Sequence, residues 1–135
     1  MSSKFSPKEL QTEEWLKKAH DDELNAHSIL THRDGTPSGT CFLSQQMAEK
    51  YLKAFLVLRK KWYPKIHPVD ALWELCFEIE KTFDEIKEEA VFLTGFYAAT
   101  RYPGDYQEFS WEMAEKAFDA ALSIKEFILN KIHEK

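Results

Sequence analysis

Arg101 is the residue whose chemistry and position best suit it to bind an anion. It ends a long apolar helical stretch and is followed at once by the turn Tyr102-Pro103-Gly104-Asp105-Tyr106. A guanidinium does not lose its proton in proteins, and a rigid turn beside a helix C-terminus would hold it in place. The simpler alternative is that Arg101 stabilises its own helix through the macrodipole, by about 0.3–1 kcal/mol, and needs no ligand. Arg101 also continues a stripe that faces the core or a cleft, made of Ile86, Ala90, Leu93 and Tyr97.

Asp22 is the polar member of an otherwise apolar face on the first predicted helix. The spacing of Trp15, Ala19, Ala26 and Ile29 places these side chains on the same face as Asp22. A carboxylate buried without a partner costs several kcal/mol, so Asp22 should pair with a cation or cap a backbone group. Arg101 is the best candidate for that cation. Alternatively, Asp22 lies at the edge of the stripe, in water.

Polar residues also align on the second predicted helix. Gln46, Glu49 and Lys53 stand at positions i, i+3 and i+7, and Lys50 is adjacent. These residues could line a binding site with Arg101. The pattern itself favours a solvated helix face, on which Glu49 and Lys53 form an ordinary ion pair that contributes about 0.3–0.5 kcal/mol.

A basic and aromatic segment follows the second predicted helix. Such a mixture can stack a nucleobase while lysines neutralise phosphates. Alternatively, the lysines only stabilise the C-terminal end of the helix through its dipole and bind no nucleic acid. It comprises Arg59, Lys60, Lys61, Trp62, Tyr63 and Lys65.

Metal and cofactor motifs are weak in this sequence. His20, Glu23 and His27 share one helix face at a spacing that a metal site would use, but no further ligand is evident. His67 precedes Pro68 and is interpreted as a helix-start residue. No Gly-rich phosphate loop, nucleophile elbow or His-Glu-x-x-His motif occurs. We therefore expect no metal or cofactor and assign no catalytic residue.

Capping and turn residues divide the chain into helices and leave no alternating strand pattern. Ser6-Pro7-Lys8-Glu9 and the capping box Thr82-Phe83-Asp84-Glu85 mark two helix starts. The expected fold is a single all-α domain over 1–135, an antiparallel up-and-down helical bundle with four long helices and one short helix. The helices are predicted at about 7–30, 40–60, 68–81, 82–101 and from 110 onward.

Composition limits the classes of protein that this chain can represent. The 135 residues carry a formal net charge of −5, which argues against a general nucleic-acid coating protein but not against a local basic site. No apolar run reaches the length of a membrane span, and the first residues form no apolar signal core, so a cytoplasmic protein without membrane partners is expected. Cys41 and Cys76 are interpreted as reduced core residues.

Several of these segments together resemble the HEPN family. The most specific are the segment Gln46-Met47-Ala48-Glu49-Lys50-Tyr51-Leu52-Lys53-Ala54 and the turn Arg101-Tyr102-Pro103, with His67 ahead of a Leu-rich helix between them. The resemblance extends from about Trp15 to Ile132. It implies a helical bundle that forms a homodimer, with Arg101 at a shared cleft. It also implies a partnership with a minimal nucleotidyltransferase in a pair that behaves as toxin and antitoxin.

One departure from the family bears on activity. Many members are metal-independent ribonucleases with an Arg followed, four to six residues later, by a His, but here those positions hold Tyr106, Gln107 and Glu108. Without that proton-transfer group, the expected function is binding of a nucleotide or RNA phosphate by Arg101, oriented by Asp105 and flanked by Tyr102. A divergent endoribonuclease with a substitute base, such as His67 folded back over the cleft, and a purely protein-binding module are the alternatives.

Overall fold

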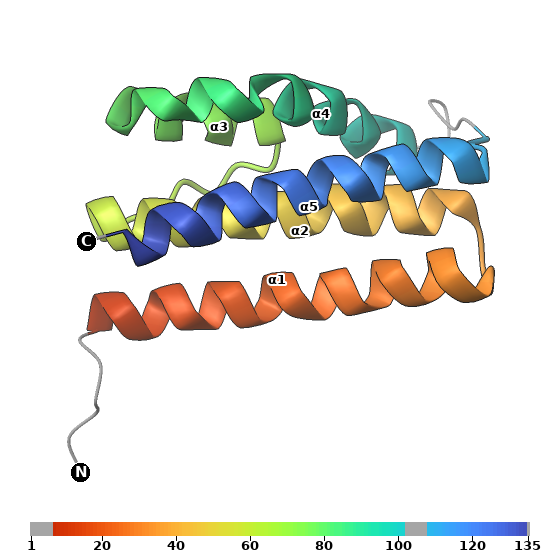
Figure 1. The fold of residues 1–135 in the computed structure, drawn as a ribbon, viewed down its shortest axis with the longest axis horizontal. Helices are drawn as coiled ribbons and strands as arrows, with labels where there is room; N and C mark the ends of the chain where they lie inside the picture. Colours follow the sequence, from red (N-terminus) through yellow and green to blue (C-terminus); the bar gives the residue numbers. More distant parts are fainter. Residues whose placement is uncertain (1–6, 102–107, 135) are drawn as a thin grey trace, which may run out of the picture.

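The computed structural model describes residues 7–101 and 108–134, without the side chains of 7–10 and 97–101. Its elements are α1 (Pro7–His32), α2 (Pro37–Lys60), α3 (Val69–Ile79), the 3-10 helix η1 (Lys81–Ile86), α4 (Lys87–Arg101) and α5 (Trp111–His133). The long helices α1, α2, α4 and α5 alternate in direction, as Figure 1 shows. The predicted up-and-down bundle of four long helices and one short helix is confirmed.

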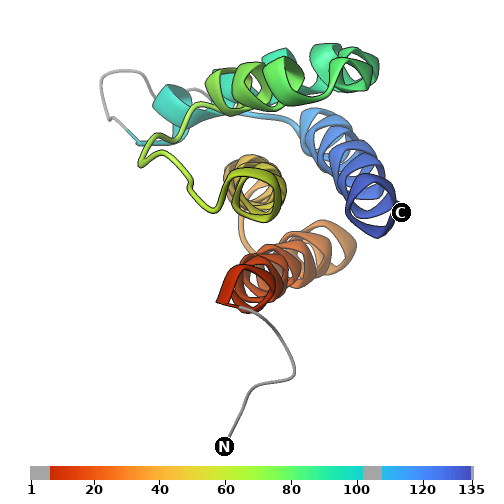
Figure 2. The same ribbon diagram turned by 90° about the vertical axis from the view of Figure 1, so that its left-hand side faces the viewer.

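Helix α2 lies at the centre of the bundle. It contacts α1, α3, α4 and α5, and the end-on view in Figure 2 shows it between α1 and the α3–α4 layer, with α5 alongside. A central helix has no broad solvated face, so its buried residues include polar as well as apolar side chains, among them Gln45, Glu49 and Lys53. The apolar core on α2 includes Met47, Leu52 and Phe55.

Local signals explain where α2 and α5 begin. Thr36 caps α2, since its hydroxyl accepts a hydrogen bond from the Gly39 backbone N–H at 3.3 Å, and Pro37 occupies the first turn. Ser110 caps α5 in the same way, through the Met113 backbone N–H at 3.0 Å. Helix α2 therefore starts at Pro37, one turn earlier than the predicted start near residue 40.

The predicted start of the fourth helix at the Thr82 capping box was wrong. The chain instead forms the 3-10 helix η1 first, with Glu80 as its N-cap, and α4 begins at Lys87. The Trp73 indole N–H donates a 2.7 Å hydrogen bond to the Phe83 carbonyl. That carbonyl would otherwise accept the Lys87 N–H in an α-helix, and the Lys87 N–H bonds to Asp84 instead.

The interior is an aromatic and aliphatic core that α3, η1 and α5 complete. The Phe83 ring packs against Phe55 at 4.7 Å and against Phe127 at 4.8 Å between centroids. Cys41 and Cys76 are free and fully buried, as predicted for core residues. Within the described ranges, none of the helices has the length and apolarity needed to cross a membrane.

Candidate functional site

The candidate site is centred on a charged cluster, which consists of the buried residues Gln45, Glu49 and Lys53 on α2 together with the half-exposed His67 from the connection to α3. The Lys53 ammonium donates to Glu49 Oε2 at 2.9 Å, and His67 Nδ1 lies 3.1 Å from the same oxygen. The Gln45 amide donates to Glu49 Oε1 at 3.4 Å and to the His67 backbone carbonyl at 3.2 Å. One carboxylate therefore connects the central helix to the α2–α3 connection.

The predicted ion pair between Glu49 and Lys53 is present, but the predicted solvated face was wrong. Glu49 is 3% exposed and Lys53 is 4% exposed. Sequence spacing places both residues on one side of α2 but does not say what covers that side, and here it is covered by packing around the central helix. Buried charges need partners to offset the cost of removing them from water, and the charged cluster supplies them. Gln46, also on the predicted face, donates to Gln45 Oε1 at 3.3 Å.

Two aromatic rings lie close to the Lys53 ammonium. The ammonium lies 5.4 Å from the Trp15 ring centroid and 5.8 Å from that of Tyr63. The two rings meet edge to face at 4.9 Å. Such cation–π contacts compensate in part for lost hydration. Because Trp15 is on α1 and Tyr63 follows α2, the contacts also join these segments.

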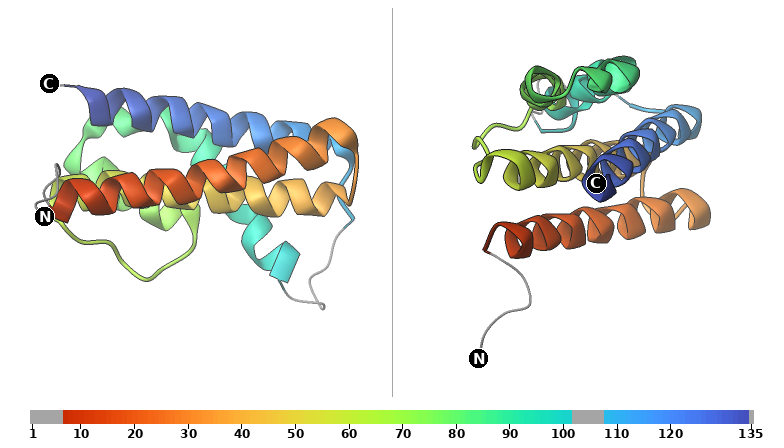
Figure 3. Two further views of the ribbon diagram at one scale, coloured as in Figure 1. Left: turned by 90° about the horizontal axis from the view of Figure 1, so that it is seen from below. Right: turned by 60° about the vertical axis from the view of Figure 1, so that its left-hand side comes forward.

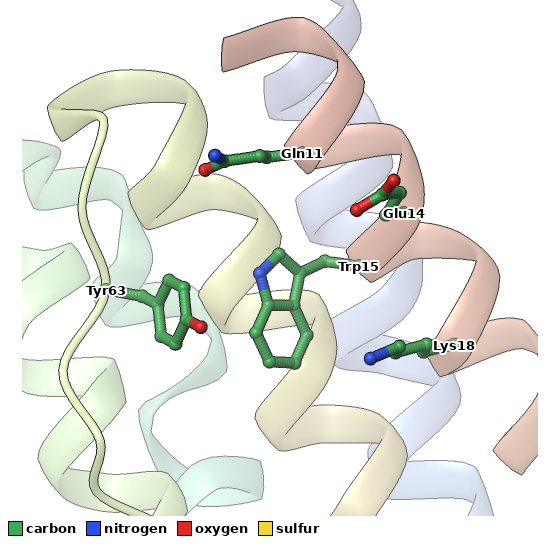
Figure 4. Close-up of a pocket in the computed structure, with 5 residues that line it drawn as sticks. All are labelled: Gln11, Glu14, Trp15, Lys18 and Tyr63. Carbon is green, nitrogen blue, oxygen red and sulfur yellow. The ribbon is translucent and has the colours of Figure 1, made fainter. Parts of the chain in front are cut away.

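A surface pocket opens beside the same two rings. Figure 4 shows Trp15 from α1 and Tyr63 from the connection facing each other, with Gln11, Glu14 and Lys18 along the α1 side. The pocket has a volume of about 240 Å³. It combines aromatic edges with one carboxylate and one ammonium, a surface on which a flat polar ligand can rest.

Asp22 has a cation partner, as its position on the apolar face of α1 required. Ala19 and Ala26 on that face are fully buried, and the Asp22 side chain is only 14% exposed. Its partner is Lys50 of α2. Asp22 is therefore not at a wet edge. The side chain of Arg101 lies outside the described residues, and its pairing with Asp22 stays a prediction.

A second polar network links α1 to α5 and α2. Glu23 accepts hydrogen bonds from Lys125 at 2.8 Å and from the Tyr51 hydroxyl at 3.1 Å. Burial opposes ionisation of Glu23, but the hydrogen bond and charge of Lys125, with Tyr51 and His20, lower its pKa below the ordinary value. Burial, then the Glu23 carboxylate, raises the pKa of Tyr51 well above its usual range. Tyr51 therefore stays a hydrogen-bond donor.

The α1 residues that are spaced like metal ligands, His20, Glu23 and His27, contact other protein groups. Glu23 is held by Lys125 and Tyr51, and His20 Nδ1 is 3.5 Å from it. His27 lies 3.4 Å from the Thr31 hydroxyl and packs against Phe118. Among the residues whose side chains are described, no group of three His, Cys, Asp or Glu could hold a metal ion.

Arg101 is the last residue of α4, and Tyr102 and Asp105 lie outside the described residues. Of the other predicted site residues, Glu49 and Lys53 are brought together, whereas Lys50 and Asp22 form a separate pair. The view from below in Figure 3 shows the end of α4 and the connection before α3 projecting from the same side of the bundle. The end of α4 and the segment that carries His67 therefore lie on the same side of the bundle.

The sequence offered His67 as a possible substitute base but did not predict its contact with Glu49. His67 precedes Pro68, as a helix-start residue would, but its ring also reaches back to Glu49 and its side chain is 48% exposed. Because a carboxylate only accepts hydrogen bonds, Nδ1 is assigned as the donor. A carboxylate that orients an imidazole through Nδ1 is an arrangement suited to general acid–base chemistry. The sequence held one signal for this contact, because Gln46, Glu49 and Lys53 form a polar series on a helix whose other residues are mostly apolar.

The fold and the charged cluster define a class of α-helical bundle protein in which a central helix carries buried charges. The sequence matches the HEPN domain family over residues 12–132, nearly the whole chain, and the chain therefore belongs to the HEPN family.

Two solved structures are similar to this chain along nearly their full lengths. The protein TT1696 from Thermus thermophilus is 27% identical, with a TM-score of 0.77, over 90% of this chain and 98% of its own. ST0689, an archaeal HEPN homologue, is also 27% identical, with a TM-score of 0.72, over 90% of this chain and 97% of its own. None of the curated proteins is similar enough to this chain to count as a relative.

Proposed function

We propose that this HEPN protein acts as a homodimer that binds a nucleotide or an RNA phosphate around Arg101. Its partner in this proposal is a minimal nucleotidyltransferase, in a pair of the toxin–antitoxin kind. The observation that carries the proposal is the end of α4, where Arg101 is the last helical residue and Tyr102-Pro103 follows it in the sequence. A guanidinium there can make charge-assisted, bidentate hydrogen bonds to a phosphate.

The contacts of the α2 lysines limit the proposed phosphate site to fewer residues than the sequence predicted. Lys50 is paired with Asp22, and Lys53 is buried against Glu49. A phosphate would have to compete with a carboxylate for either ammonium. We therefore assign the direct phosphate contact to Arg101, flanked by Tyr102 and Asp105, and assign the two lysine pairs to positioning α2.

Binding of ATP, measured by calorimetry, tests the proposal. Arg101→Ala should weaken binding by about 1–3 kcal/mol, the usual loss for a charge-assisted contact. Arg33→Ala is the matched control, because Arg33 is also an arginine at the C-terminal end of a helix but already contacts Glu115 and Trp111. Equal binding by the wild type and Arg101→Ala would refute the phosphate site and favour a protein-binding module.

A divergent metal-independent endoribonuclease is the second candidate, favoured by the contact between His67 and Glu49. An imidazole held by a carboxylate can replace the missing motif His as a proton-transfer group, which typically contributes 10²–10⁴-fold to a rate. Single-stranded RNA incubated with the protein in EDTA distinguishes the candidates. The binding proposal expects no cleavage. The enzyme would be established instead if the wild type cleaved the RNA, and if His67→Gln lowered the cleavage rate roughly 10²–10⁴-fold and abolished its pH optimum.

A further inference from the structure

A row of surface hollows with shared walls lies where α2 ends. The first is the pocket beside Trp15 in Figure 4, and Gln11 and Tyr63 are also walls of a second hollow. Trp62 is a wall of this second hollow and of a third, which it shares with Leu75 of α3. The hollows therefore form one continuous strip from α1 to α3, which we call the aromatic track, with Trp15, Tyr63 and Trp62 along it.

Trp62 is the most unusual residue of the aromatic track because its indole is exposed. Its exposed fraction is 56%, although the fold has a core that takes up other aromatic rings. The exposure follows from how α2 ends, since Lys61 takes a left-handed conformation with φ of 59° and turns the chain out of the helix. An indole left in water contributes little to folding, but its open face suits stacking.

The charge of the aromatic track is opposite to that of the protein. Lysines line all three hollows, and only Glu14 and Glu78 oppose them. The whole chain carries −5. Within the part of the chain whose side chains are described, Lys60, Lys61 and Lys65 form no ion pair. The lining lysines are Lys18, Lys60, Lys61 and Lys65.

We propose that the aromatic track binds single-stranded RNA, with bases stacked on Trp62 and against the Trp15–Tyr63 pair and with phosphates near the lysines. Aromatic rings on which bases can stack, flanked by cations that can neutralise phosphates, are the features of surfaces that bind single strands. A membrane surface fits less well, because it favours a contiguous apolar face. The choice of RNA over other single strands rests on the proposed function.

This surface is distinct from the proposed phosphate site. The C-terminal end of α2 and the C-terminal end of α4 lie toward opposite ends of the bundle in Figure 1. Each site therefore has its own diagnostic substitution, Trp62→Ala for the aromatic track and Arg101→Ala for the site at the end of α4.

Fluorescence anisotropy with a labelled oligouridylate of about twelve nucleotides tests the aromatic track. Trp62→Ala should weaken binding roughly 5- to 100-fold, and Trp62→Phe, which still stacks, should recover most of it. Val91→Ala is the matched control, because Val91 is also an exposed apolar side chain, at 54%. Thermal unfolding of each variant checks that the fold is retained.

The lysines are tested through the salt dependence of binding. Each phosphate contact contributes about 0.7 to the slope of log K against log salt for a single strand. Replacing Lys60, Lys61 and Lys65 together by Gln should therefore lower the slope by about 2. Lys116→Gln, on the outer face of α5 with its side chain 64% exposed, should leave the slope unchanged.

Three results would overturn the aromatic track. The first is that the protein does not bind oligouridylate at low salt. The second is that Trp62→Ala binds as tightly as the wild type. The third is that Arg101→Ala loses binding whereas Trp62→Ala keeps it. The last would leave the proposed function standing. Conversely, binding lost only in Trp62→Ala, together with no ATP binding, would support the aromatic track and refute the phosphate site. Binding to anionic phosphatidylserine vesicles without any binding to RNA would assign the surface to membranes and refute the proposal.

Discussion

Replacing Lys53 by Met tests whether burial makes the Glu49–Lys53 pair important for stability. Met keeps the length and the helix propensity of Lys but removes the charge. The Glu49 carboxylate would stay 3% exposed without its ammonium partner. Breaking a buried pair costs about 3–5 kcal/mol. Gln45 and His67 still contact this carboxylate, so we expect the lower end, about 3 kcal/mol.

The chain supplies a matched control for this prediction. Glu112 and Lys116 have the same i, i+4 spacing in the same order on α5, but their side chains are 80% and 64% exposed. Lys116→Met should therefore cost no more than about 0.3–0.5 kcal/mol. The two pairs differ mainly in burial, so the difference between the variants isolates its effect.

Urea denaturation followed by circular dichroism measures both costs, at one protein concentration because a dimer would make stability concentration-dependent. The double variant Glu49→Gln/Lys53→Met should cost at least about 2 kcal/mol less than the sum of its single variants. Equal costs for Lys53→Met and Lys116→Met would refute the reasoning from burial.

Three further predictions concern assembly and protonation. Sedimentation at micromolar concentrations should give a homodimer, and a monomer throughout that range would remove the shared cleft around Arg101. Because the folded protein holds the pKa of Tyr51 above its unfolded value of about 10, the unfolded chain loses that proton first. Stability should therefore fall as the pH rises above about 10, and Tyr51→Phe should flatten that fall if Tyr51 is its source. Burial raises the pKa of Cys41 to about 11, so iodoacetamide should not label this thiol in the native protein at about pH 8. Labelling of Cys41 before the protein unfolds would mean that α2 opens locally.

The fold could be predicted because its signals are local. Proline and capping residues marked the starts of α1 and α5, and the helical periodicity of Ala19 and Ala26 identified the buried face of α1. The start of α4 could not be predicted in this way. It depends on the hydrogen bond from the Trp73 indole to the Phe83 carbonyl, and this contact exists only after α3 and η1 have packed together.

The candidate site was predicted less completely, for a related reason. The alignment of Glu49 with Lys53 is a property of the helix and was correct, but the burial of the pair is a property of the whole bundle. The need of Asp22 for a cation followed from its apolar surroundings. Its pairing with Lys50 did not, because α1 and α2 must first take their relative rotation. His67 is 18 residues from Glu49 along the chain, beyond the reach of any helical spacing.

The central position of α2 also determines how the molecule opens. Its backbone amides are enclosed by α1, α3, α4 and α5, so no single outer helix can detach and expose all of them. Hydrogen exchange from the middle of α2 should therefore require global unfolding, whereas amides at the ends of α1 can exchange through local fraying. The slowest amides of α2 would then report the free energy of unfolding of the whole domain under native conditions.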